Sequence, residues 1–144
     1  MNINQAIEER ILKRIKPDVE LVKKEFNESD YDFKKSGKAF EEGDYKWAIV
    51  QAYYSMFHSA RAVLFKLGFQ EKRHSAIIPV LEDLDSRGKL ETTYVNDFKA
   101  GIFAREDADY HYSYFKESAK HMIEITDEFK ERMKRLIEEL NKLT

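Results

Sequence analysis

Ionisable and aromatic side chains concentrate in one short segment, residues 104–115, with the sequence AREDADYHYSYF. Arg105 and His111 are the two of its side chains best suited to chemistry. An imidazole titrates near neutral pH, so it can take the proton from a ribose 2′-hydroxyl or give one to the leaving oxygen. A guanidinium can hold the phosphate and offset the charge that develops in the transition state. The pair therefore suits cleavage of RNA through a cyclic phosphate, without a metal ion.

The spacing of this pair leaves two interpretations open. On a straight helix, six residues turn two side chains about 240° apart. Arg105 and His111 would converge only if the chain breaks between them or if two copies of the chain meet. Alternatively, Arg105 forms an ion pair with Asp107 or Asp109, and His111 caps or packs at a helix junction. Charge clusters are often structural, and the spacing by itself favours this second interpretation.

The remaining histidines are weaker candidates. His58 is equally consistent with a satisfied core histidine and with a residue that lines a site. His74 precedes a helix start, where a local structural role is the better interpretation, and His121 is expected at the surface. The absence of cysteine excludes thiol chemistry and cysteine metal sites. For the candidate site we predict neither a metal nor a cofactor.

A central helix over residues 44–68 is predicted to position these groups, because this is the most apolar continuous stretch of the chain. Asp44 can cap its start, and Gly68 can take the left-handed conformation that ends it. A narrow polar stripe interrupts the apolar surface at Gln51, Ser55 and His58, with Arg61 one turn on. The stripe must face water, a polar neighbouring chain, a second subunit or a ligand.

The same periodicity predicts the other helices. They cover residues 3–15, which Pro17 ends, residues 19–43, a segment capped by Ser75 that reaches Leu84, residues 90–104, and a long final helix. The polar interval 27–30 could bend the second helix. The chain is thus expected to be all-α, an up-and-down four-helix bundle with one or two accessory helices. We expect one domain over residues 1–144, with residues 1–16 as the accessory N-terminal helix.

Composition narrows the functional classes. With 144 residues the chain can bury a core without disulfides, and the lack of cysteine suits a reducing cytoplasm. No stretch predicts export or membrane insertion. The formal net charge is −2, so nucleic-acid binding would need a local or dimer-generated basic patch. The charged run 128–139 pairs Glu128 with Arg132 and Glu131 with Arg135, which indicates a solvated helix face more than an RNA-binding surface.

Three blocks of sequence, residues 39–65, the turn KRHSAII at 72–78 and REDADYH at 105–111, resemble the HEPN domain family, in particular a small prokaryotic branch of it. The resemblance implies a four-helix bundle that forms a homodimer. Active members are metal-independent ribonucleases, often toxins that act beside a minimal nucleotidyltransferase antitoxin. The chain differs from the pattern at Glu106, after the motif arginine, and at Ser113, where some members carry a modified tyrosine.

The resemblance assigns catalytic roles to Arg105 and His111 in a cleft composed from both subunits. Beside them we expect Asp109 to orient a neighbour, and Tyr110, Tyr54 and His58 to line the cleft. Two other functions remain open. The chain could be a non-catalytic module that binds a nucleotidyltransferase partner or a nucleotide, or a purely structural dimerisation module. RNA turnover separates the first hypothesis from the others.

Overall fold

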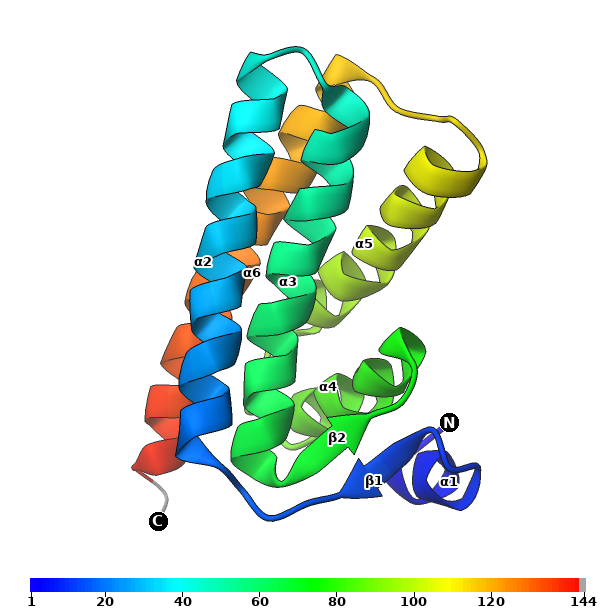
Figure 1. The fold of residues 1–144 in the computed structure, drawn as a ribbon. Helices are drawn as coiled ribbons and strands as arrows, with labels where there is room; N and C mark the ends of the chain where they lie inside the picture. The colour runs from blue at the N-terminus through cyan, green and yellow to red at the C-terminus, as the bar shows by residue number, and fades with distance from the viewer. Residues whose placement is uncertain (143–144) are drawn as a thin grey trace.

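Four helices form the body of the molecule in the computed structural model, which describes residues 1–142 (Figure 1). They are α2 (Val19–Glu41), α3 (Tyr45–Leu67), α5 (Thr92–Tyr110) and α6 (Lys116–Asn141), and each runs opposite to the one before it. The predicted all-α up-and-down four-helix bundle with accessory helices is confirmed. Within residues 1–142, no helix is long and apolar enough to cross a membrane.

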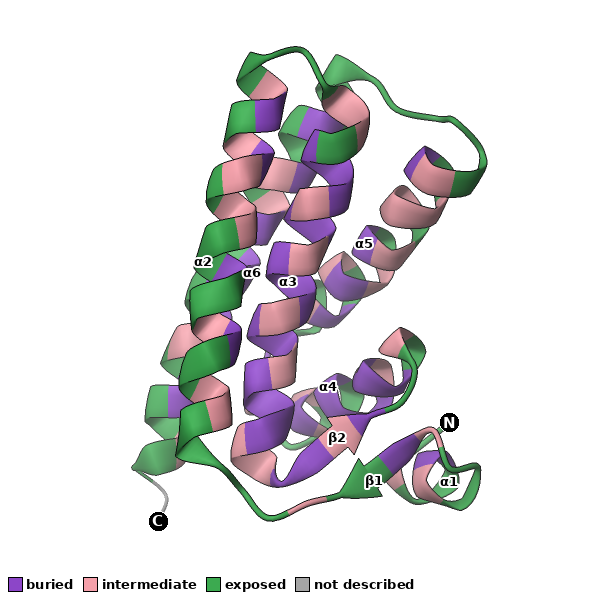
Figure 2. Cartoon of the chain, in the orientation of Figure 1, coloured by how far each residue is buried: buried purple, intermediate pink, exposed green. Residues whose placement is uncertain are grey.

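Helix α3 is the centre of the bundle, as the sequence predicted. The side chain of Asp44 accepts a hydrogen bond from the backbone N–H of Trp47 at 3.3 Å and so caps its start. Gly68 ends it with a φ of 86°, in the left-handed region. Figure 2 shows that most of α3 is buried, whereas α2 and α6 each have an exposed outer face. The other helices therefore pack around α3.

The polar stripe of α3 faces α2. Its partners are therefore polar groups of a neighbouring helix in the same chain. The Ser29 hydroxyl donates to the Ser55 carbonyl at 2.7 Å, and the Ser55 hydroxyl donates to the Ser29 carbonyl at 2.8 Å. His58 Nδ1 lies 2.6 Å from Glu25 Oε2. Gln51 Oε1 is buried and makes no hydrogen bond among the described residues. The helix that supplies these partners, α2, is continuous from residue 19 to residue 41.

The predicted N-terminal helix over residues 3–15 is correct only in its first half. Helix α1 (Ile3–Glu8) ends early, Arg10 turns the chain with a φ of 61°, and β1 (Leu12–Arg14) follows. β1 pairs in antiparallel register with β2 (Phe69–Glu71), directly after α3. Leu12, which is 1% exposed, packs into the core from this strand. Pairing with a distant segment has overridden the local helical pattern.

Strand β2 leads directly into a tight turn. Glu71 accepts a hydrogen bond from Arg61 Nε at 2.6 Å, which ties the strand to α3. A 3₁₀ turn, η1 (His74–Ala76), then enters α4 (Ile77–Ser86). Ser75 lies inside this turn, and its hydroxyl caps neither η1 nor α4, so the predicted cap is wrong. His74 is consequently held at the junction of strand and helix.

Helix α5 is longer than predicted and continues through the cluster that the sequence placed at a junction. It ends at Tyr110 instead of Ala104, and an ion pair between Arg105 and Asp109, four residues apart, spans its last turns. Earlier in the helix, Gly101 allows a close crossing. A Cβ atom at this position would lie 3.0 Å from Met56 Sδ and 3.1 Å from Met122 Cε. Arg105, one turn further on, is thereby carried close to α3.

Helix α6 holds a buried arginine where an exposed face was predicted. Arg132 is only 5% exposed. Its Nε donates to Glu91 Oε1 at 2.6 Å, and its Nη2 donates to the Lys89 carbonyl at 3.0 Å. Its Nη1 donates to Glu139 Oε1 at 3.3 Å. The predicted solvated face is therefore wrong for Arg132, because the turn before α5 folds over it.

Candidate active site

A pocket of about 390 Å³ opens between α3, the 3₁₀ turn and α5. Pockets of this size accept small ligands in other proteins. Its lining combines aromatic, basic and hydroxyl-bearing side chains from these three elements: Tyr53, Tyr54, Arg73, His74, Ser75, Ile102, Arg105 and Glu106. The pocket therefore contains Arg105 and Tyr54 from the predicted site, and the other lining residues were not predicted.

Three neighbouring side chains orient Arg105 at this pocket. Its guanidinium lies over the rings of Tyr54 and Tyr110, 5.6 Å and 5.9 Å from their centroids. Its Nε donates to Asp109 Oδ2 at 3.2 Å. Among the described residues, Nη1 and Nη2 make no hydrogen bond. Two aromatic rings and one carboxylate thus orient the guanidinium and leave its outer N–H groups available to an anion.

His74 is the imidazole that lies in the same pocket as Arg105, although the sequence favoured a local structural role for it. Its ring stacks on Phe57 with centroids 4.1 Å apart. Its Nδ1 lies 2.8 Å from the hydroxyl oxygen of Tyr53. No other hydrogen bond engages the ring within the described chain. Tyr53 comes from the middle of α3, so only the folded chain brings these groups together.

The protonation state of His74 follows from its surroundings. Burial, followed by the charges of Arg105, Arg61 and His58, lowers the pKa of His74 from its usual value of 6.5. Burial also raises the pKa of the Tyr53 hydroxyl well above its usual value of 10.0. Near neutral pH both groups are therefore uncharged. Tyr53 is 1% exposed, so its O–H needs an internal acceptor, and His74 Nδ1 is in place to accept it. The imidazole proton then resides on Nε2.

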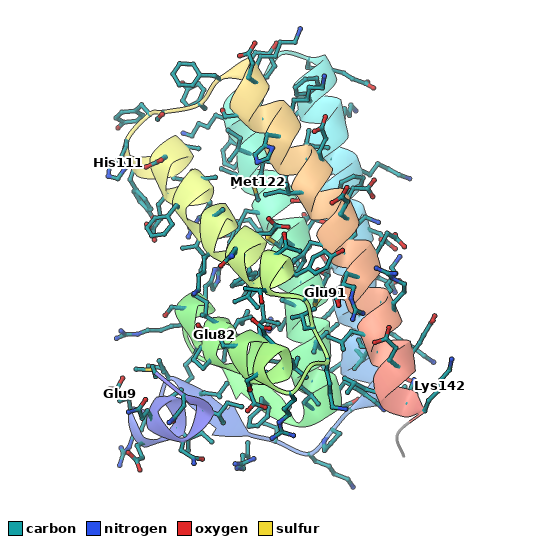
Figure 3. The ribbon with its side chains drawn as sticks, turned by 180° about the vertical axis from the view of Figure 1, so that it is seen from behind. Glu9, Glu82, Glu91, His111, Met122 and Lys142 are labelled. Atoms are coloured by element: carbon teal, nitrogen blue, oxygen red, sulfur yellow. The ribbon has the colours of Figure 1, made fainter. Side chains whose placement is uncertain are left out.

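His111 lies outside this pocket. It follows the last residue of α5, at the outer tip of the helix where the connection to α6 begins (Figure 3). Its side chain is 69% exposed, and its Nδ1 lies 3.0 Å from Asp107 Oδ1. Because α5 is unbroken up to Tyr110, the chain break that could bring His111 to Arg105 is absent. Of the two routes to convergence, only the meeting of two copies remains.

The alternative interpretation, in which Arg105 and His111 have structural roles, also agrees with the contacts of these two residues. Arg105 pairs with Asp109, and His111 occupies the C-terminal cap of α5. Asp109 and Tyr110 both contact Arg105, as residues that orient it would. These contacts are equally compatible with a structural cluster and with a preorganised site.

His58 is separate from the pocket. Its Nδ1 contacts Glu25, and its Nε2 lies 3.5 Å from Asp32 Oδ2. It is not among the residues that line the pocket with Tyr54. Potential ligand atoms of Glu28, Asp32 and His58 lie within 4.8 Å of one another, close enough to hold a metal ion. The carboxylates around His58 account for its position without one.

Exposed aromatic rings surround the tip of α5. Phe103 and Tyr110 are 67% and 65% exposed, and Tyr112 and Phe115, in the connection to α6, are 77% and 64% exposed. Tyr112 has a φ of 55°, which is uncommon for a residue with a side chain. Such rings can stack on unpaired bases or bury against another protein surface.

The sequence analysis missed His74, Tyr53 and Arg73 as site residues. The available signal was the KRHS turn, which entered only as a block of resemblance. Tyr53 gave no signal, because an aromatic residue on an apolar helix is the ordinary composition of a core.

A family model described as HEPN domain matches residues 22–136, a span that includes Arg105, His74 and His111. A protein of Methanocaldococcus jannaschii named "Putative toxin MJ0605" is 29% identical over 103 residues. The alignment covers 70% of this chain and 77% of that protein.

Proposed function

Because this chain belongs to the HEPN domain family, we propose that it is a ribonuclease of toxin type that acts as a homodimer and needs no metal ion. The observation that carries the proposal is the presentation of Arg105. Its guanidinium is oriented by Tyr54 and Tyr110, and both of its terminal NH2 groups are without a hydrogen bond among the described residues, beside a pocket. This is the arrangement expected of a group that grips a phosphate and stabilises developing negative charge.

His111 is the proposed general acid or base. Asp107 engages its Nδ1 and leaves Nε2 for proton transfer, and the exposed imidazole is accessible to a large substrate. Within one chain the helix directs Arg105 and His111 to different sides. We therefore place the active site between two copies of the chain, where an arginine of one subunit meets a histidine of the other.

The proposed reaction is an internal transfer at phosphorus. The base removes the proton of a ribose 2′-hydroxyl, the 2′-oxygen forms a bond to phosphorus, and the bond to the 5′-oxygen breaks. A protonated imidazole supplies the proton to that leaving oxygen. The products are a 2′,3′-cyclic phosphate and a 5′-hydroxyl, and Arg105 stabilises the charge on the phosphorane-like transition state.

A partner forms part of the proposal. We infer that a minimal nucleotidyltransferase acts as the antitoxin, as the family resemblance implies. The name of the M. jannaschii relative, which calls that protein a toxin, supports this context. The exposed aromatic rings at the tip of α5 offer a surface that such a partner or an RNA could cover.

Cleavage of end-labelled structured RNA in excess EDTA tests the reaction. We expect the wild-type dimer to leave cyclic phosphate ends, and the Arg105→Ala and His111→Ala variants to be at least about 100-fold slower. His121→Ala is the matched control, because His121 is exposed on α6 and lies outside the site. Equal cleavage by wild type and both site variants would refute the proposal.

A separate experiment tests whether the active site combines Arg105 of one subunit with His111 of the other. In a two-fold dimer, a mixed dimer of Arg105→Ala and His111→Ala subunits retains one intact pair. Co-refolding equal amounts of the two inactive variants should therefore restore about a quarter of the wild-type activity. Failure to restore any activity in a preparation that contains mixed dimers would place the two residues in independent roles.

The second candidate is a non-catalytic module that binds a nucleotidyltransferase or a nucleotide. The pairing of Arg105 with Asp109 and of His111 with Asp107 favours it, because both side chains already have partners. In this case ligand binding should raise the melting temperature while RNA remains intact.

A further inference from the structure

Several hydrogen-bond donors in the Arg105 pocket have no partner within the described chain. They are the outer N–H groups of Arg105, the Nε2–H of His74 and the hydroxyls of Tyr54 and Ser75. None of these atoms is sealed from solvent, since the described residues contain no such orphaned donor in a buried position. Donors that converge on one pocket without internal acceptors are the elements of an anion site.

We propose that His74 is a second phosphate-binding residue, which donates a hydrogen bond from Nε2 to a phosphate oxygen that Arg105 also holds. The inference rests on the proposed function only for the source of the phosphate, an RNA backbone. The site itself follows from the pocket and from the contacts of His74. His74 takes the part of a positioning group for the phosphate, whereas proton transfer belongs to His111.

The orientation of His74 is fixed from two sides. Phe57 stacks on its ring, and the Tyr53 hydroxyl occupies Nδ1. A buried tyrosine hydroxyl has to donate, so Nδ1 accepts and Nε2 carries the hydrogen. The neutral imidazole of His74 is suited to bind an anion beside the guanidinium of Arg105. It adds a directed hydrogen bond, and no second positive charge has to lose its hydration.

The charges around His74 support the same ligand. Tyr53 and Tyr54 of α3 contact its ring, and the charges of Arg61 and His58 on the same helix act on it from further away. Arg105 and Glu106 on α5 line the pocket with it, as does Arg73 beside it in the chain. Glu106 is the acidic member of the pocket lining. Arg61 is paired with Glu71 and Glu25, and Arg105 is paired with Asp109. Arg73 makes no ion pair among the described residues. The positive charge of Arg73 therefore favours an anion in the pocket, beside the donors named above.

Nuclear magnetic resonance of the imidazoles tests the proposal on the full chain. The protein has four histidines, so each can be assigned by single substitution. Adenosine 5′-monophosphate is the probe and adenosine is its control without phosphate. We expect the phosphate to raise the pKa of His74, because a neighbouring anion favours the protonated imidazole. Adenosine should leave that pKa unchanged.

Substitutions give the second readout. His74→Ala should weaken binding of adenosine 5′-monophosphate about tenfold, the effect of losing one hydrogen bond to a charged group. His74→Gln keeps an N–H donor near the position of Nε2 and should recover part of this loss. Tyr53→Phe keeps the ring and removes the hydroxyl, so it should shift the tautomer of His74 in nitrogen spectra. His121→Gln, on the exposed side of α6, should change nothing.

Two results would overturn the inference. One is an unchanged His74 pKa at saturating adenosine 5′-monophosphate, and the other is wild-type affinity in a folded His74→Ala protein. Phosphate binding at His74 without RNA cleavage would support the pocket and count against the ribonuclease. Cleavage of RNA with no response at His74 would overturn the pocket and leave the ribonuclease standing.

Discussion

The buried guanidinium of Arg132 allows a stability prediction that depends on the fold alone. It joins α6 to the turn before α5 through a bidentate contact with Glu91, at 2.6 Å and 3.2 Å, and through the Lys89 carbonyl. Replacement by methionine keeps most of the apolar volume and removes every one of these hydrogen bonds. We predict that Arg132→Met destabilises the protein.

The loss of stability in Arg132→Met depends on the carboxylates that lose their partner. Removing one partner of a fully buried ion pair costs about 3–5 kcal/mol. Here the carboxylate side chains of Glu91 and Glu139 are 56% and 52% exposed, so water can solvate them once Arg132 is gone. This screening reduces the expected loss to about 2–3 kcal/mol, comparable to one or two charge-assisted hydrogen bonds. In a chain of this length the melting temperature should fall by roughly 5–10 °C.

Equilibrium unfolding in urea, followed by circular dichroism, measures the loss. Arg135→Met is the matched control, because it makes the same chemical change at an exposed position of the same helix. It should alter the free energy of unfolding by no more than about 0.5 kcal/mol. If Arg132→Met falls within that range as well, the contacts of Arg132 do not stabilise the fold, and the reasoning is refuted.

Three further predictions concern stability. Gly68→Ala should destabilise by about 1–3 kcal/mol, because a Cβ atom would meet the Ile15 carbonyl oxygen at 2.9 Å and the φ of 86° disfavours alanine. Gly37 lies in α2, and a Cβ atom there would meet nothing within 4 Å, so Gly37→Ala should raise the free energy of unfolding by up to about 1 kcal/mol. Urea unfolding measures both variants, and a change of the same sign in the two would contradict the prediction. The hydrogen bond from Arg132 lowers the pKa of Glu91 from its usual value of 4.5. Its contribution to stability is therefore present above that value and is lost as pH falls through the lower folded-state pKa. The difference in unfolding free energy between wild type and Arg132→Met should shrink over this acid range, and a constant difference would exclude the linkage.

The parts of the fold that the sequence predicted are those governed by local periodicity and capping. The central helix carries its boundaries in Asp44 and Gly68, and both act as predicted. The prediction of a helix over the whole N-terminal segment was wrong, because the second half of this segment pairs with Phe69–Glu71, far along the chain. No periodicity within residues 3–15 reports such a partner, since strand pairing is set by tertiary context.

The candidate site was predictable only in part for a similar reason. Arg105, Asp109 and Tyr110 are neighbours on one helix, so their spacing in the sequence was informative. Polar composition nevertheless suggested a junction, although the ion pair of Arg105 with Asp109 favours continued helix. His74 depends on Tyr53, which lies 21 residues away in the sequence. A side chain that is oriented by a distant element has no local signature.

The pairing of β1 with β2 has a consequence for how the protein is divided into fragments. The family match begins at residue 22, so a fragment cut at that boundary lacks β1. The carbonyl of Gly68 and the N–H of Lys72, which bond to Ile15 and Ile11 in the whole chain, would lose these partners. An unprotected strand edge next to a newly uncovered apolar surface invites pairing between molecules. Oligomers of such a fragment would be products of trimming, and the native stoichiometry has to be measured on the chain that retains its first strand.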